Sequence, residues 1–378
     1  MKAICKVGIA GCGKVAHLHA KAIQELESVE LAAVWSRSES TAAEFGSEYG
    51  ANVFPSIGAM VEAEGLDLVI VCTPHPFHKD PVLEAAEAGA NVLVEKPLAS
   101  TLEDCDRMIE GCESAGVRLG VICQRRWYEP SIRVKQAIEA GKIGTPILGS
   151  VMLFGWRDQD YYDADAWRGT WLMEGGGVMV NQAPHPLDLF LWFMGDVEEV
   201  YGISRNLNHP GIEVEDTAVA VVKFKNGALG NIILSNSQKP GLYGKVHVHG
   251  ENGASVGTQP EGGAMFIAGS TGIPDPPIND LWTVPGEEQL LDEWKAEDAE
   301  IHGKIDATVH YIGCQIEDFA NAIRESREPA VTGRDGRKVV ELFSAIYRST
   351  RDNAPIAFPL SPECDRDDMD GRSGSALR

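Results

Sequence analysis

The chain has 378 residues, of which 44% are hydrophobic and 24% charged, as in ordinary globular proteins. Its length exceeds what one hydrophobic core usually serves, so we expect two domains. The formal net charge of -23 argues against nucleic acid and anionic membranes as partners, because both are bound by basic surfaces.

Cysteine spacing and hydropathy both predict a cytoplasmic protein. The eight cysteines form no close CxxC pair, and several lie in apolar strand-like runs, as free thiols do in a reducing compartment. The first residues enter a strand at once, without the regions of a signal peptide. No apolar run approaches the roughly 20 residues that span a bilayer.

The first third of the chain alternates strands with helices. Near-continuous apolar runs, typical of strands buried on both faces, occur at 6–10, 31–35, 68–72, 91–94 and 121–123. Helical segments are expected at 14–26 and 39–49. This order predicts βαβ units and an α/β fold, with a Rossmann domain, a doubly wound parallel sheet, over residues 1–124.

Residues 125–362 predict a second, α+β domain. After a helix at 131–140, longer strands with alternating features form a large, mainly antiparallel sheet, at 147–156, 197–205, 217–224, 228–236 and 245–250. The Gly- and Pro-rich stretch 258–285 predicts a long loop, and 363–378 a polar tail. Helices are expected at 309–326 and 336–351, the last able to pack back on the first domain. The open sheet face needs covering, so we expect a homodimer or homotetramer.

A glycine-rich turn joins the first strand to the first helix. In its GxGxxA pattern, Gly11 permits the tight turn, Gly13 lets a pyrophosphate approach the backbone, and Ala16 keeps the helix close to the sheet. Between a strand and a helix, this pattern predicts a dinucleotide site rather than a glycine turn of another α/β domain. The expected cofactor contacts are Gly11, Cys12, Gly13, Lys14 and Val15.

The end of the second strand bears on which nicotinamide cofactor binds. An acid there holds the ribose 2′-hydroxyl of NAD, whereas a small polar residue followed by Arg can accept the 2′-phosphate of NADP. The chain has Ser36 and Arg37 with no acid before Glu39, which favours NADP. The alternative is that Arg37 stacks on the adenine of bound NAD.

Three further segments carry candidate site residues. The first follows a buried strand and supplies Thr73, Pro74, His75 and His78. The second is Glu95-Lys96-Pro97, and the third is 175–188, which begins with three glycines. With the glycine turn, these segments resemble the glucose–fructose oxidoreductase / inositol dehydrogenase / rhizopine catabolism (Gfo/Idh/MocA) family over nearly the whole chain. The resemblance implies an NAD(P)-dependent oxidoreductase in which the first two segments contact the cofactor.

Lys96 is the first candidate catalytic residue. It follows a strand, and ligands of doubly wound sheets bind outside the carboxyl ends of the strands. From there its ammonium can hydrogen-bond a substrate oxygen and stabilise developing alkoxide charge. The resemblance also implies contacts of Glu95 and Lys96 with the cofactor and a cis bond before Pro97. The alternative, from this segment alone, is a surface lysine that begins a helix.

His185 is the second candidate, as the base that accepts the hydroxyl proton. Asn181 lies four residues earlier, so on a helix both side chains would share one face. The alternative for His185 is a core histidine satisfied by the backbone. Many inositol dehydrogenase-like relatives have Asp where this chain has Asn181. Asn can orient a hydroxyl or the imidazole but cannot act as a base, so the proton transfer falls to His185.

Weaker candidates lie at the domain junction and beyond it. The resemblance places Gln124, Trp167 and Arg168 near the cofactor and Arg126 near the substrate, although a helix cap or a salt bridge is an equal explanation for each arginine. His310 and Tyr311 are further substrate candidates. His247 and His249 share one face of a strand, a spacing that zinc could use, but no third ligand accompanies them and we expect no metal. Asp188 is expected to be structural.

The function predicted from these residues is reversible oxidation of a secondary hydroxyl on a sugar, cyclitol or related polyol. Hydride passes to the nicotinamide, His185 takes the proton, Lys96 stabilises the oxygen and Asn181 holds a neighbouring hydroxyl or His185. One alternative is a redox-neutral sugar-modifying enzyme, of the glycosidase or lyase type, with a tightly bound nicotinamide cofactor. Another is a non-catalytic nicotinamide-sensing protein.

Overall fold

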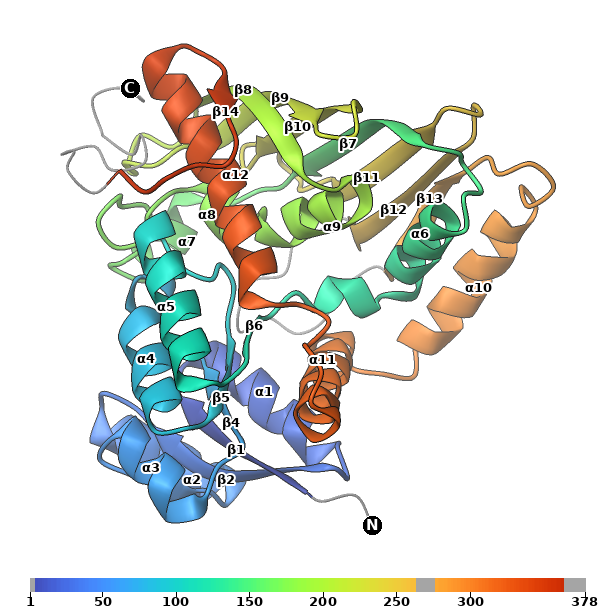
Figure 1. Cartoon of the computed structure of the whole chain (residues 1–378). Helices are drawn as coiled ribbons and strands as arrows, with labels where there is room; N and C mark the ends of the chain where they lie inside the picture. Colours follow the sequence, from blue (N-terminus) through green and yellow to red (C-terminus); the bar gives the residue numbers. More distant parts are fainter. Residues whose placement is uncertain (1–3, 263–275, 364–378) are drawn as a thin grey trace.

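The computed structural model describes residues 4–262 and 276–363 (Figure 1). The amino-terminal part contains a six-stranded sheet whose paired strands are all parallel, in the order β3-β2-β1-β4-β5-β6. Its strands are β1 (Cys5–Ala10), β2 (Val29–Trp35), β3 (Asn52–Val53), β4 (Leu68–Val71), β5 (Asn91–Val94) and β6 (Leu119–Val121). The direction of winding reverses between β1 and β4, where ligands of such sheets bind. The prediction of a doubly wound parallel sheet is confirmed.

Strand β4 shows why the predicted strands are apolar throughout. All of its four residues are buried, and they alternate between the two faces of the sheet. Leu68 and Ile70 pack in a cluster with residues of α1, α2 and α11, whereas Val69 and Val71 pack with residues of α3, α4 and α5. The helices concerned are α1 (Lys14–Gln24), α2 (Glu39–Tyr49), α3 (Ile57–Glu64), α4 (Lys79–Glu87), α5 (Leu102–Ala115) and α11 (Ala307–Glu325).

The second sheet has eight strands in the order β13-β12-β11-β7-β10-β9-β8-β14. All neighbours pair antiparallel except β7 and β10, which are parallel. The strands are β7 (Pro146–Phe154), β8 (Val197–Arg205), β9 (Thr217–Phe224), β10 (Leu229–Ser235), β11 (Tyr243–Gly250), β12 (Ser255–Gly262), β13 (Ile278–Trp282) and β14 (Ile356–Ala357). The prediction of a large, mainly antiparallel sheet is confirmed.

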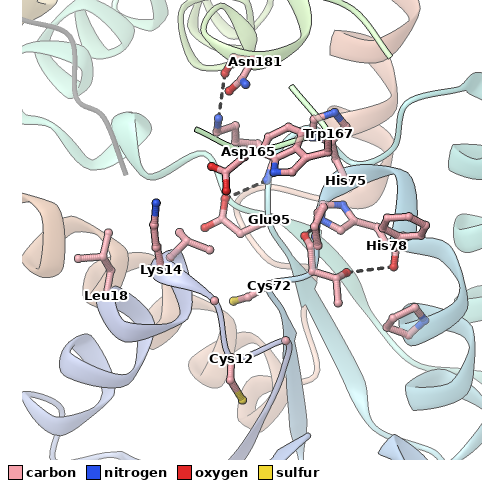
Figure 2. Close-up of a pocket in the computed structure, with 18 of the residues that line it drawn as sticks. Cys12, Lys14, Leu18, Cys72, His75, His78, Glu95, Asp165, Trp167 and Asn181 are labelled. Carbon is pink, nitrogen blue, oxygen red and sulfur yellow. Dashed lines mark hydrogen bonds between the residues drawn. The ribbon is translucent and has the colours of Figure 1, made fainter. Parts of the chain in front are cut away.

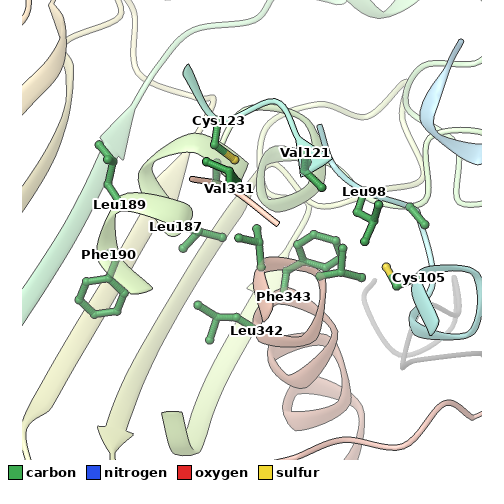
Figure 3. Packing of buried hydrophobic residues seen from close by; sticks show 14 of the residues in the cluster. Leu98, Cys105, Val121, Cys123, Leu187, Leu189, Phe190, Val331, Leu342 and Phe343 are labelled. Carbon is green, nitrogen blue, oxygen red and sulfur yellow. The ribbon is translucent and has the colours of Figure 1, made fainter. Parts of the chain in front are cut away.

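Helices connect and cover this sheet on the side of the first domain (Figure 1). They are η2 (Gln124–Trp127), α6 (Glu129–Glu139), α7 (Gln159–Asp163), α8 (Val178–Asn181), α9 (Pro184–Met194), α10 (Leu290–His302) and α12 (Gly333–Asp352). Helix α11 contacts α1 of the first domain, and α12 contacts both α5 and β8. Figure 3 shows Phe343 of α12 beside Leu98 and Val121, in the same hydrophobic cluster as Leu187 of α9. The two sheets therefore share a continuous core.

The predicted loop at 258–285 is wrong at both ends. Strand β12 runs to Gly262 and β13 spans Ile278–Trp282, while 263–275 lie outside the described residues. Pro260 suggested a loop because it cannot donate to a strand ladder. The register shifts opposite it, between Gly244 and Val246 of β11, and such an irregularity accommodates proline inside a strand. The predicted tail from residue 364 onward is also outside the described residues. Among the described helices, none is long and apolar enough to cross a membrane.

Candidate active site

A cavity of about 830 Å³ opens at the carboxyl ends of β1, β2, β4 and β5. The first domain forms one wall, and segments 157–168 and 181–185 of the second domain form the other. Figure 2 shows Lys14 and Leu18 of α1 on one side and His75 and Trp167 on the other. The cavity therefore lies where the sheet topology predicts a ligand.

The glycine turn lines this cavity. Gly11 has φ +98°, and a Cβ there would lie 2.8 Å from the Thr73 amide nitrogen, so a larger residue would not fit. A Cβ on Gly13, at the amino-terminal end of α1, would meet no atom within 4 Å. Gly13 therefore leaves the helix amino-terminus open to an anionic group, as binding of a pyrophosphate requires. Cys12, Lys14 and Val15 also line the cavity.

Residues at the end of β2 and directly after it also line the cavity. Ser36 and Arg37 both line it, and Arg37 is exposed. Glu39 does not line the cavity. It lies in the first turn of α2, where the helix dipole stabilises its negative charge.

The segment after β4 lines the cavity as predicted, and contacts of its histidine rings with backbone carbonyls hold it in position. Thr73, Pro74, His75 and His78 all line the cavity. The two ring nitrogens of His78 lie 3.0 Å from the Leu98 carbonyl oxygen and 2.8 Å from the Thr73 carbonyl oxygen. The His75 ring contacts the Glu174 carbonyl and stands edge-on to Trp167, with ring centroids 5.7 Å apart. His78 therefore fixes this loop, and His75 ties it to the second domain.

Lys96 projects from the end of β5 toward the second domain. Its Nζ donates a hydrogen bond to the Asn181 carbonyl oxygen at 2.9 Å (Figure 2). The Lys96–Pro97 peptide is cis, as the family resemblance implies. Glu95 is buried, and its Oε1 lies 2.8 Å from Nε2 of His19. Burial raises the pKa of Glu95, but the hydrogen bond and charge of His19 outweigh it, with a contribution from Lys96, and hold the pKa below its ordinary value.

His185 faces the same cavity from α9 and is 8% exposed. Among the described residues, no group hydrogen-bonds its Nδ1, although this atom is buried. Burial lowers the pKa of His185 well below its ordinary value, and the positive charges of Arg125 and Lys96 lower it further. The imidazole is therefore neutral near pH 7 and able to accept a proton. A buried imidazole nitrogen without a partner does not fit a core histidine satisfied by the backbone.

The single-helix argument for Asn181 and His185 is wrong, although both residues line the cavity. Helix α8 ends at Asn181 and α9 begins at Pro184, so a break separates the two side chains. The Asn181 amide donates hydrogen bonds to the carboxylate of Glu174 and to Oη of Tyr161. The proline at the start of α9 explains the break, because its missing N–H suits the first turn of a new helix.

Glu174 is a buried carboxyl group behind Asn181. It is 1% exposed, and its Oε2 accepts a hydrogen bond from the Gly169 amide. Burial raises its pKa to about 7, although the hydrogen bonds from Asn181 and Gly169 act in the opposite direction. Sequence reasoning missed Glu174, because the candidate segment was recognised by its three glycines and began one residue later, at position 175.

Replacing Glu174 should change how stability depends on pH. An acid whose folded-state pKa lies above its ordinary value of 4.5 contributes stability below that value and loses it as the pH rises through about 7. Glu174→Gln does not titrate, so its unfolding free energy relative to the wild type should rise by on the order of 3 kcal/mol between about pH 4.5 and pH 8. Urea unfolding of both proteins across this range measures the difference. A difference that stays constant with pH would contradict the assignment.

Three weaker candidates lie elsewhere than predicted. Arg126 is outside the cavity lining and makes a bidentate ion pair with Asp188, with N–O distances of 2.6 and 2.8 Å. Its assignment to the substrate is therefore wrong, and the structural assignment of Asp188 agrees with this contact. Tyr311 is buried and donates to Glu129 at 2.6 Å, and His310 also lies outside the lining. Helix α11 presents a different face to the cavity, through Thr308 and Ile312.

Other residues at the junction line the cavity, some of them as predicted. Gln124, Trp167 and Arg168 are among the lining residues. Arg125, in the junction segment 124–127 where the resemblance implies substrate and nicotinamide contacts, also lines the cavity. Sequence reasoning missed further lining residues, namely Tyr128, Arg157, Tyr161 and Gln182. On the second sheet, Nε2 of His247 lies 2.9 Å from the Asp280 carboxylate. Within the described ranges, no group of three or more His, Cys, Asp or Glu side chains could hold a metal.

Family comparisons agree with this geometry. Residues 5–123 match the model described as "Oxidoreductase family, NAD-binding Rossmann fold", and residues 132–256 match the "GFO/IDH/MocA C-terminal domain". The chain belongs to the Gfo/Idh/MocA oxidoreductase family. The family resemblance expected from the motifs is confirmed, as is the prediction of an oxidoreductase.

Similar proteins cover nearly the whole chain. Myo-inositol 2-dehydrogenase of Thermotoga maritima is 25% identical over 361 residues, covering 93% of this chain and 98% of that protein. D-apiose dehydrogenase of Paraburkholderia graminis is 27% identical, covering 99% and 94%. The WlbA dehydrogenase from Bordetella pertussis, solved with NADH and UDP-GlcNAcA, is 32% identical with a TM-score of 0.82, covering 96% of this chain and 100% of that one.

Proposed function

We propose that this oxidoreductase interconverts a secondary hydroxyl and a ketone on a sugar, cyclitol or related polyol, with NAD or NADP as hydride carrier. The observation that carries the proposal is the pair of side chains across the cavity. Lys96 from the first domain and His185 from the second line the same space, close enough for the lysine charge to lower the pKa of the imidazole. An acid–base group beside a fixed cation is what oxidation of an alcohol requires.

The residues present fit a nicotinamide dinucleotide. The turn at Gly11 and the open approach at Gly13 leave room for the pyrophosphate, and the side chains of Lys96 and His185 line the same cavity. When bound, the cofactor accepts a hydride from the substrate carbon or returns one to it. In the oxidation direction His185 takes the hydroxyl proton, and the Lys96 ammonium stabilises the negative charge on the oxygen. Asn181 would position a neighbouring hydroxyl, because its amide is held by Glu174 and Tyr161.

The relatives support a carbohydrate substrate. Two are named as dehydrogenases of myo-inositol and D-apiose, and the WlbA structure contains a nucleotide sugar. A panel of cyclitols, sugars and nucleotide sugars, each with NAD and with NADP, tests the proposal by the absorbance of reduced cofactor. We expect net reduction with at least one member of the panel. Conversion of a sugar with no net change in cofactor would support the redox-neutral alternative, and failure of every member would contradict the proposed function.

The cofactor preference within this function is a separate proposal. Ser36 and exposed Arg37 at the cavity rim favour NADP, because a guanidinium makes charge-assisted hydrogen bonds to a 2′-phosphate. Arg37→Ala should lower kcat/KM for NADP by about 10- to 100-fold and change the value for NAD much less. Steady-state kinetics with both cofactors measure this ratio. Equal losses with the two cofactors would indicate instead that Arg37 stacks on the adenine.

The second sheet supports a homodimer or homotetramer. Its outer face carries exposed apolar side chains on β8, β9 and β10, at Ile203, Val219, Val221 and Leu229. An apolar patch of this kind is usually covered by another subunit. A cytoplasmic location is supported by the cysteines, because those in the described ranges are free thiols.

A further inference from the structure

The side-chain amide of Asn181 is held by two hydrogen bonds in the wall of the cavity. One goes to Oε1 of Glu174 and the other to Oη of Tyr161. An amide nitrogen carries two hydrogens, so these contacts use both. Within the part of the chain that the structure describes, no group donates to the amide oxygen, and no hydrogen bond joins Asn181 to His185. The oxygen is therefore the polar atom that this side chain offers to a ligand.

The chemistry of Glu174 fixes which atom of Asn181 faces it. An ionised carboxylate only accepts hydrogen bonds, so the atom in contact with it is the amide nitrogen. The other carboxylate oxygen accepts from the Gly169 amide at 2.6 Å. The backbone of Glu174 is held as well, because its carbonyl contacts the His75 ring and its amide donates to the Thr170 carbonyl at 3.0 Å. An aspartate at position 181 would place two carboxylates in contact, so this position suits asparagine.

Tyr161 holds the second hydrogen of the same amide. Its hydroxyl accepts from the Asn181 amide and from the Gln182 amide, each at 3.3 Å. The orientation of Gln182 is fixed in turn, because its Oε1 accepts from the Asn236 amide at 2.9 Å. The Tyr161 ring is held by the Arg168 guanidinium, which lies 4.0 Å from its centroid. The hydroxyl of Tyr161 is therefore an acceptor in a fixed position.

We propose that Glu174 and Tyr161 are positioning residues that hold Asn181 as a hydrogen-bond acceptor, and that the substrate carries a free hydroxyl on the carbon next to the oxidised one. This inference rests on the proposed dehydrogenase function and narrows its substrate class to vicinal diols. The neighbouring carbon is indicated because Lys96, the proposed ligand of the reacting oxygen, donates to the Asn181 carbonyl at 2.9 Å (Figure 2). A hydroxyl can donate to the amide oxygen, whereas a ketone, an ether or a deoxy carbon cannot.

Substrate analogues test the direction of this hydrogen bond. The parent is the panel member with the highest kcat/KM, assayed at about pH 8, because burial raises the pKa of Glu174 to about 7. Each hydroxyl beside the oxidised carbon is replaced in turn by hydrogen and by fluorine, neither of which donates; for D-glucose oxidised at C3, the replacements are at C2 and C4. At one of these carbons both replacements should lower kcat/KM by about 10-fold or more. Full activity of the fluorinated analogues, which keep a weak acceptor, would overturn the proposal.

Single variants test the residues that hold the amide. The readout is the ratio of kcat/KM between the parent and its deoxy analogue. Asn181→Ala should bring this ratio close to one. Glu174→Gln and Tyr161→Phe should each lower it by about 3- to 10-fold, because a glutamine amide can also donate to the Asn181 oxygen and phenylalanine accepts no hydrogen bond. Losses that are equal for the parent and the analogue would indicate a purely structural role and overturn the proposal.

An exchange of donor and acceptor gives a rescue test. Asn181→Asp alone places two carboxylates in contact and should lower kcat/KM for the parent at about pH 8 by about 10-fold or more. In the double variant Asn181→Asp/Glu174→Gln, the glutamine amide donates to the aspartate, which still accepts from the substrate. Most of the loss should therefore be recovered. Losses that simply add in the double variant would contradict the proposed contact.

Matched controls separate these effects from folding. Tyr162→Phe changes a buried tyrosine of the same helix whose hydroxyl contacts Asn236, and Glu341→Gln changes a buried carboxyl group that accepts from the Leu360 amide. Neither residue lines the cavity, so the ratio should stay unchanged. The thermal midpoint and NADH affinity are measured for each variant, and Tyr161→Phe keeps the test decisive if Glu174→Gln does not fold.

The inference and the proposed function fail in different ways. Equal kcat/KM for the parent and all of its deoxy analogues would overturn the inference and leave the proposed function standing. Reduction of cofactor by no member of the panel would overturn both.

Discussion

Lys96→Met should lower kcat by about 10²- to 10³-fold, the usual cost of removing one group that stabilises a developing oxyanion. Methionine keeps much of the length of the side chain but cannot donate a hydrogen bond or carry a charge. The Lys96 ammonium is already held in the cavity by the Asn181 carbonyl, so little reorganisation is needed when the substrate oxygen gains charge. We therefore expect kcat and kcat/KM to fall by similar factors, as they do when an interaction exists only in the transition state.

Lys79→Met is the matched control for this prediction. Lys79 is a partly buried lysine on α4 that forms an ion pair with Asp104 and does not line the cavity. It should leave kcat unchanged, and NADH titration should show that Lys96→Met still binds cofactor. A higher KM with an unchanged kcat in Lys96→Met would mean that this lysine only binds the substrate.

The fold was predictable where a single physical pattern decides it. Strand β4 is apolar at every position because both of its faces are covered, whereas β9 alternates between buried residues such as Val222 and exposed ones such as Val221. These two patterns separate a parallel from an antiparallel sheet. The prediction was wrong at Pro260, because a register shift in the paired strand is a tertiary feature that one segment does not reveal.

The part of the site at strand ends was also predictable. Parallel strands end at a common edge, so Gly11, Thr73 and Lys96 must meet there whatever the rest of the fold does. Site predictions that rested only on the position of a residue within a sequence segment were less reliable. Arg125 and Arg126 are adjacent in the short helix η2, yet the first lines the cavity and the second turns inward to Asp188.

The contribution of the second domain needs the assembled structure. Tyr161 lies in α7, and Arg157 precedes this helix. With five residues, α7 is too short to show a periodic pattern of apolar residues. Glu174 acts through Asn181, and nothing in its own segment indicates that the two side chains will meet. Such contacts depend on how loops return to the cavity.

His185→Asn should lower kcat for alcohol oxidation by about 10²- to 10⁴-fold, because the side chain that we propose accepts the hydroxyl proton would be lost. Asparagine fills part of the space of the imidazole and remains polar, so the effect reports the loss of the base rather than a cavity. Stopped-flow measurement of reduced cofactor with the preferred sugar separates this step from product release. His249→Asn is the matched control, since His249 is a half-buried histidine on β11 that contacts Ser255 and lies outside the cavity lining.

The pH profile of the wild type gives a second test of this base. Burial first, and then the charges of Arg125 and Lys96, hold the pKa of His185 well below its ordinary value, so the free imidazole is neutral throughout the neutral range. An unprotonated base is active above its pKa, so kcat/KM for oxidation should not fall from this group until the pH drops well below 6.5. A fall centred near pH 6.5 that disappears in His185→Asn would show that the imidazole is not desolvated as the structure has it. Partial restoration of His185→Ala by added imidazole would instead place the proton transfer at this side chain.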